Sequence, residues 1–120
     1  MQMEDSKVKK FKNQAAQGDV LIRRVAELPA NATPQPDTSY HIISHSETGH
    51  HHSITAPPSV VQLFGSGNPL VSYMRVKSRP VELKHERSFD THDTLELDEG
   101  IYEIRRQKEW APEGWRRVMD

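Results

Sequence analysis

The feature that most constrains this fold is a succession of short apolar or alternating runs, each closed by proline, glycine or a charged turn. After residue 17 the runs span residues 20–25, 40–45, 50–55, 60–64, 70–76, 81–85, 95–97 and 101–107. Short runs rich in β-branched residues and separated by turn signals are typical of strands, and no helical pattern competes with them. We therefore expect an all-β chain, a small single-domain β-barrel or sandwich of about eight short strands.

The first 17 residues have a different character, because lysines crowd between Lys7 and Lys12 and apolar side chains are few. A short helix is conceivable within this segment, but an isolated helix of so few residues is marginal in water. The sequence predicts a flexible N-terminal arm over residues 1–17, followed by one β domain over residues 18–120. Gly18-Asp19, a turn signal, marks the boundary between them.

Two adjacent pairs of runs are separated by tight turn signals. Ser46-Glu47-Thr48-Gly49 separates the runs at 40–45 and 50–55, and Asp98-Glu99-Gly100 separates those at 95–97 and 101–107. Each pair is predicted to form a β-hairpin, since glycine supplies the backbone freedom that a tight turn needs.

Composition excludes several kinds of protein. A chain of 120 residues is the size of one domain, and it has no cysteine, which removes disulfides and thiolate chemistry. A formal net charge of -1 gives no overall attraction to nucleic acid or anionic membranes. No apolar run approaches the roughly 20 residues needed to cross a bilayer, and no signal peptide is evident. We expect a cytoplasmic protein with no membrane partner.

The histidines are the residues whose choice looks chemical. His50 and His52 share a strand face with Ile54, while His51 lies on the opposite face. The same alternation puts His85 on the face of its apolar neighbours in the run 81–85. If these faces point inward, the imidazoles converge, since residues two apart on a strand lie about 6.5–7 Å apart at Cα.

Converging imidazoles suit a divalent metal such as zinc or iron. The predicted ligands are His50, His52, His85 and His92, with Glu86 as an alternative to His92 and Glu47 as a weaker candidate. The alternative interpretation is that these histidines are ordinary hydrogen-bonded residues. No motif distinguishes a nucleophile or a general base, so the sequence assigns no catalytic residue and leaves enzymatic activity open.

The C-terminal segment mixes arginine with tryptophan. Such interleaving suits base stacking and phosphate contact, or a protein partner. Alternatively, the tryptophans close the β domain or cover a neighbouring subunit while the arginines stack on them, which the near-neutral net charge favours. The predicted contact residues are Arg105, Arg106, Trp110, Trp115, Arg116 and Arg117.

Several segments together resemble a group of small uncharacterised bacterial and phage proteins. They are GDVLI at 18–22, TGHHHSI at 48–54, HDTLEL at 92–97, GIYEIRRQ at 100–107 and PEG at 112–114. The resemblance covers residues 17–120 and matches the four predicted histidine ligands to histidines of the group. It implies family membership but no particular activity. The sequence departs from the group at one place, where the group's short HEEH segment is replaced by the longer stretch from His85 to His92.

The His-X-His hairpin is also distantly similar to that of cupins, although the cupin glutamate and second glycine motif are not matched. Two functions follow from these observations. One is an intracellular binding module, phage- or mobile-element-encoded, that oligomerises or binds a protein or RNA partner. The alternative is a histidine-ligated, cupin-like protein that binds a divalent metal, with or without enzymatic activity.

Overall fold

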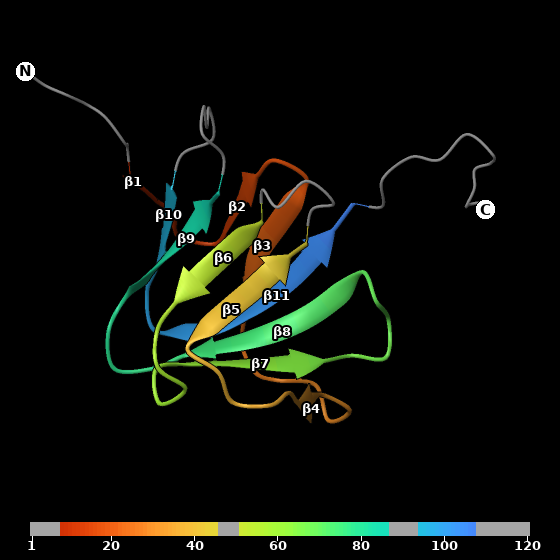
Figure 1. Cartoon of the computed structure of the whole chain (residues 1–120). Helices are drawn as coiled ribbons and strands as arrows, with labels where there is room; N and C mark the ends of the chain where they lie inside the picture. Colours follow the sequence, from red (N-terminus) through yellow and green to blue (C-terminus); the bar gives the residue numbers. More distant parts are fainter. Residues whose placement is uncertain (1–7, 46–50, 87–93, 108–120) are drawn as a thin grey trace, which may run out of the picture.

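The computed structural model describes residues 8–45, 51–86 and 94–107 and arranges them in two β-sheets (Figure 1). The five-stranded sheet has the order β1 (Val8–Lys10), β10 (Thr94–Leu97), β9 (Val81–His85), β6 (His52–Thr55) and β5 (Tyr40–Ser44). The six-stranded sheet has the order β2 (Gln14–Gln17), β3 (Val20–Val25), β11 (Gly100–Arg106), β8 (Val71–Val76), β7 (Val61–Gly65) and β4 (Thr33–Pro34).

The described residues confirm the all-β fold, and each predicted run contains a strand. Three further short strands, β1, β2 and β4, join them. Each sheet has two end strands that do not pair with each other, so the described part of the chain is a sandwich and not a closed barrel. No described helix is long and apolar enough to cross a membrane.

The core lies between the sheets and follows the alternation of the strands. In β3, Val20 and Ile22 are fully buried while Leu21 between them is exposed. In β9, Val81 and Leu83 are buried while Glu82 and Lys84 are exposed. Successive side chains of a strand point to opposite faces, so each sheet turns one apolar face inward.

Part of the segment predicted as a flexible arm is paired within the sheets. β1 runs parallel to β10, and β2 lies antiparallel to β3. Phe11 packs edge-on against Tyr102, with ring centroids 6.1 Å apart. The turn at Gly18, with φ 59, folds β2 back onto β3, so the chain before it gains a partner strand. The first seven residues lie outside the described residues.

The predicted pairing of 40–45 with 50–55 is confirmed, since β5 and β6 are antiparallel neighbours. The predicted hairpin between 95–97 and 101–107 is wrong. β10 pairs with β9 and β1 in one sheet, whereas β11 pairs with β3 and β8 in the other. The turn between them therefore carries the chain from one sheet to the other.

Side-chain bonds hold this crossover in place. The hydroxyl of Tyr102 donates to the carbonyl of Asp98 at 2.6 Å, and the guanidinium of Arg24 donates to the same hydroxyl at 2.9 Å. Gly100 has φ 154, and a Cβ at this position would lie 2.2 Å from a guanidinium nitrogen of Arg24. Glycine leaves room for this guanidinium, and its φ lies in a region that residues with a Cβ rarely adopt.

Candidate functional site

Three elements meet at one end of the sandwich, which we call the histidine end. His52 begins β6, His85 ends β9, and the two residues are directly opposite in the ladder between these strands. From the six-stranded sheet, Gln17 ends β2 and Asp19 lies in the β2–β3 turn. The histidine end consists of these four residues.

The rings of His52 and His85 are stacked, with centroids 4.1 Å apart and an interplanar angle of 3°. His52 is buried, on the same face as the fully buried Ile54, and His85 is half-buried. The structure therefore brings together two of the four histidines predicted as ligands. The other two, His50 and His92, lie outside the described residues.

Gln17 links the two sheets and orients His52. Its amide nitrogen donates to the carbonyl of Leu83 at 2.9 Å, and its amide oxygen lies 2.7 Å from Nδ1 of His52. A carbonyl can only accept, so the amide nitrogen faces Leu83 and the amide oxygen faces the imidazole. A neutral His52 consequently carries its proton on Nδ1 and a lone pair on Nε2.

The lone-pair nitrogen of His52 faces a carboxylate. Nε2 lies 3.8 Å from Oδ1 of Asp19, whose side chain is 47% exposed. A protonated His52 would form an ion pair with Asp19 across this gap. With a neutral His52, the same gap lies between a nitrogen lone pair and a carboxylate oxygen, two groups that both attract a cation.

These distances are compatible with a shared metal ion. Zinc binds nitrogen at about 2.0–2.1 Å and carboxylate oxygen at about 2.0–2.2 Å, so two ligands of one ion lie no more than roughly 4.3 Å apart. The ring of His85 lies in a plane parallel to that of His52 and 4.1 Å from it at the centroids, so it must turn to direct its lone pair at the same ion. Among the described residues, no three His, Cys, Asp or Glu side chains form a metal-binding group.

Glu86 lies away from the histidine end. One of its carboxylate oxygens accepts hydrogen bonds from the hydroxyl of Tyr40, at 2.5 Å, and from the hydroxyl of Ser53. Ser53 follows His52 in β6 and points to the opposite, outer face of the sheet. The hydrogen bonds from Ser53 and then Tyr40 lower the pKa of Glu86, and the bond to Glu86 raises the pKa of Tyr40.

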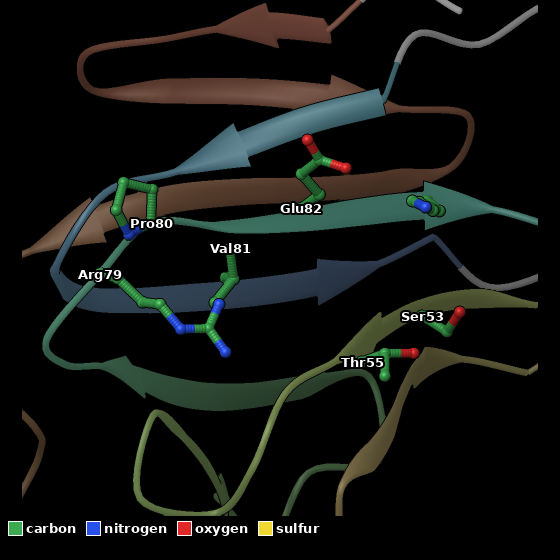
Figure 2. A pocket seen from close by; sticks show the side chains of 7 residues that line it. Ser53, Thr55, Arg79, Pro80, Val81 and Glu82 are labelled. Carbon is green, nitrogen blue, oxygen red and sulfur yellow. The ribbon is translucent and has the colours of Figure 1, made fainter.

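A groove of about 280 Å³ lies on the outer face of the five-stranded sheet (Figure 2). We call it the outer groove. It runs along β6 and β9 beside the turn that precedes β9, and its lining is mostly polar and charged. The lining residues are Ser53, Thr55, Arg79, Pro80, Val81, Glu82 and Lys84.

Arg105, predicted as a contact residue, is part of a cluster on the six-stranded sheet. Its Nε donates to the carboxylate of Glu103 at 2.9 Å, and Arg23 donates to the same oxygen at 3.1 Å. Burial raises the pKa of Glu103, but the hydrogen bonds and charges of Arg105 and Arg23 outweigh it, so the net shift is downward. Arg105 therefore neutralises a buried carboxylate.

Arg106, the other described contact residue, joins the two sheets. Its Nη1 donates to the carbonyl of Ile43 at 3.0 Å and to the hydroxyl of Ser72 at 3.1 Å. Nη2 donates to the carbonyl of Pro69 at 2.9 Å, and burial lowers the pKa of Arg106. The remaining predicted contact residues lie outside the described residues: Trp110, Trp115, Arg116 and Arg117.

The sequence did not point to Gln17, Asp19 or Arg79. Gln17 belongs to a stretch of alanine and glutamine, residues with weak strand preference, so its strand was missed. The available signal was the Gly18-Asp19 turn, which can equally join two strands of a hairpin. Arg79 stands just before a proline, and only the folded chain shows that it borders the outer groove.

Comparison with known families gives one match. Residues 16–107 match the model of a family described as a domain of unknown function, DUF8820. The matched range includes all four residues of the histidine end. No curated protein and no solved structure matches the chain. The bacterial or phage origin inferred from the sequence stays a prediction.

Proposed function

The chain belongs to the DUF8820 family, domains of unknown function, and we propose that it is a binding domain that holds a divalent metal ion at its histidine end. The single observation that carries this proposal is the orientation of His52. Its Nδ1 is bonded to Gln17, and its Nε2 faces the carboxylate of Asp19.

This arrangement is what metal-binding histidines usually have. A ligating imidazole typically donates its other ring N–H to a carbonyl or carboxylate, which selects the tautomer and fixes the ring. Gln17 is 1% exposed and is itself held by the carbonyl of Leu83, so it is a rigid acceptor for this purpose. The cost of burying these polar groups is offset because each has a partner.

The proposed ligands are the four histidines predicted from the sequence, together with Asp19. Of these histidines, His52 and His85 belong to the described residues, whereas His50 and His92 lie outside them. Imidazole nitrogen and carboxylate oxygen suit zinc and iron, and in a tetrahedral zinc site four of these five side chains would bind the ion. Such a metal would add its binding energy to the stability of the fold.

The test is a calorimetric titration of zinc chloride into untagged, metal-free protein. We expect one saturable site per chain in the wild type and loss of that site in His52→Ala. His51→Ala is the matched control, since His51 is adjacent in sequence and lies on the other face of the strand. Equal loss in both variants, or no saturable binding in the wild type, would refute the proposal.

A second candidate is an interaction module that oligomerises or binds a protein partner. β5 is an end strand of its sheet, and Tyr40 on it is 45% exposed. An end strand can pair with a strand of another chain. RNA contact is less favoured, because Arg105 and Arg106 are engaged in internal bonds. Light scattering separates a monomer from an oligomer and can be repeated with and without zinc.

A further inference from the structure

We propose that the outer groove binds an oxyanion, such as the phosphate group of a small molecule, through Arg79 and Lys84. This site is independent of the histidine end. The two sites lie on opposite faces of the five-stranded sheet, since Ser53 and Lys84 of the groove alternate with His52 and His85 along the same two strands.

Two cations, Arg79 and Lys84, line the groove together with the carboxylate of Glu82. The carboxylate of Glu86 lies at its edge, where it already accepts hydrogen bonds from the hydroxyls of Ser53 and Tyr40. Figure 2 shows the side chain of Arg79 extending toward β6, where Thr55 lies, while Glu82 points the other way. Within the described part of the chain, neither cation has an ion pair. Their charge is thus available to a ligand.

The backbone before Arg79 is strained in a way that fixes this residue. The amide of Arg79 donates to the carbonyl of Lys77 at 2.9 Å, and Ser78 between them has φ 78. This is the less common kind of γ-turn, which is strained, and strain of this sort persists where the surrounding structure holds it and often marks a functional site. Pro80 also restricts the backbone of Arg79.

An arginine on an ordered backbone is a good anion receptor. Its planar guanidinium can donate two parallel hydrogen bonds to a phosphate or a carboxylate. Because the turn already orders the backbone of Arg79, binding costs less backbone entropy than it would with a mobile loop. Thr55 adds a hydroxyl that can donate a hydrogen bond to the ligand, whereas the hydroxyl of Ser53 already donates to Glu86. The volume of about 280 Å³ suits a small ligand.

The experiment is a titration of metal-free, isotope-labelled protein with sodium phosphate, and separately with sodium acetate, at constant ionic strength. We expect saturable shifts of the backbone amides of Arg79, Val81 and Thr55. The two salts distinguish a phosphate site from a general carboxylate site. Arg79→Gln should weaken binding about tenfold or more, the worth of a charged hydrogen bond. Arg79→Lys keeps the positive charge but loses the planar pair of donors. Its affinity for phosphate should lie between that of the wild type and that of Arg79→Gln.

Controls separate this site from its surroundings. Lys9→Gln removes an exposed lysine on β1, outside the groove, and should bind phosphate like the wild type. The titration uses metal-free protein, so a failed metal site leaves this test intact. Circular dichroism verifies that each variant is folded. No saturable shift with either salt, or equal weakening by Lys9→Gln and Arg79→Gln, would overturn the proposal.

Discussion

His52 and His85 stack face to face across two neighbouring strands, with ring centroids 4.1 Å apart and planes within 3° of parallel. Two positive charges at such a separation repel each other strongly in a partly buried site. The stack therefore suits a pair in which at least one ring is neutral. A neutral imidazole is also the form that binds a metal, so acidification should release the metal.

The two rings should differ in what they contribute to stability. His52→Phe keeps an aromatic ring but removes the hydrogen bond of 2.7 Å to the buried amide oxygen of Gln17. We expect a loss of about 1 kcal/mol in the free energy of unfolding, the usual net contribution of one hydrogen bond. His85→Phe, at a half-buried position, should cost less. Urea denaturation measures both, and a larger loss in His85→Phe would contradict the bonding described for Gln17.

Glu86 should make the stability of the protein depend on pH. Hydrogen bonds from Ser53 and Tyr40 lower its pKa below the ordinary value of 4.5. A carboxylate whose pKa is lowered by folding stabilises the fold at pH values above its unfolded-state pKa. This contribution disappears as the pH falls through the folded-state pKa. Glu86→Gln should therefore destabilise by about 1 kcal/mol at neutral pH and match the wild type in acid.

Thermal unfolding at several pH values checks this prediction. Glu27→Gln is the control, because Glu27 is exposed and far from the Tyr40–Glu86–Ser53 cluster in the chain. Its melting temperature should follow that of the wild type throughout. A difference in melting temperature between Glu86→Gln and the wild type that stays constant from neutral pH to below pH 4.5 would rule out the assigned hydrogen bonds.

The strain at Ser78 should be measurable. A residue with a Cβ at φ 78 is unfavourable, and glycine removes the clash. Ser78→Gly should be more stable than Ser78→Ala by about 1 kcal/mol, because alanine keeps the Cβ. If the strained turn presents Arg79, the looser glycine variant should also bind phosphate more weakly. A less stable glycine variant would show that this backbone is relaxed.

The sequence predicted strands well where apolar and polar residues alternate within a single run. β3 and β9 follow the period of two closely, and the same alternation correctly placed His52 and His85 on inward faces. The pairing of β10 failed because a turn signal shows that the chain reverses, not which sheet the next strand joins. That choice depends on Tyr102 and Arg24, whose bonds hold the crossover.

Other parts depend on contacts between segments distant in sequence. β2 forms because β3 offers a partner, although alanine and glutamine favour strands weakly. Gln17 reaches Leu83, 66 residues away, and such a contact has no local signal. Glu86 was a candidate ligand beside His85, but adjacent residues of a strand point to opposite faces, and its partners are on the outer one.

The most direct test of the central claim is a nitrogen-15 NMR measurement of the imidazole of His52, with and without zinc. We predict that Nδ1 carries the proton in the metal-free protein, because it faces the amide oxygen of Gln17. We also predict that the Nε2 resonance moves to that of a metal-bound nitrogen when zinc is added. A proton on Nε2 in the metal-free protein, together with no change on adding zinc, would contradict the account.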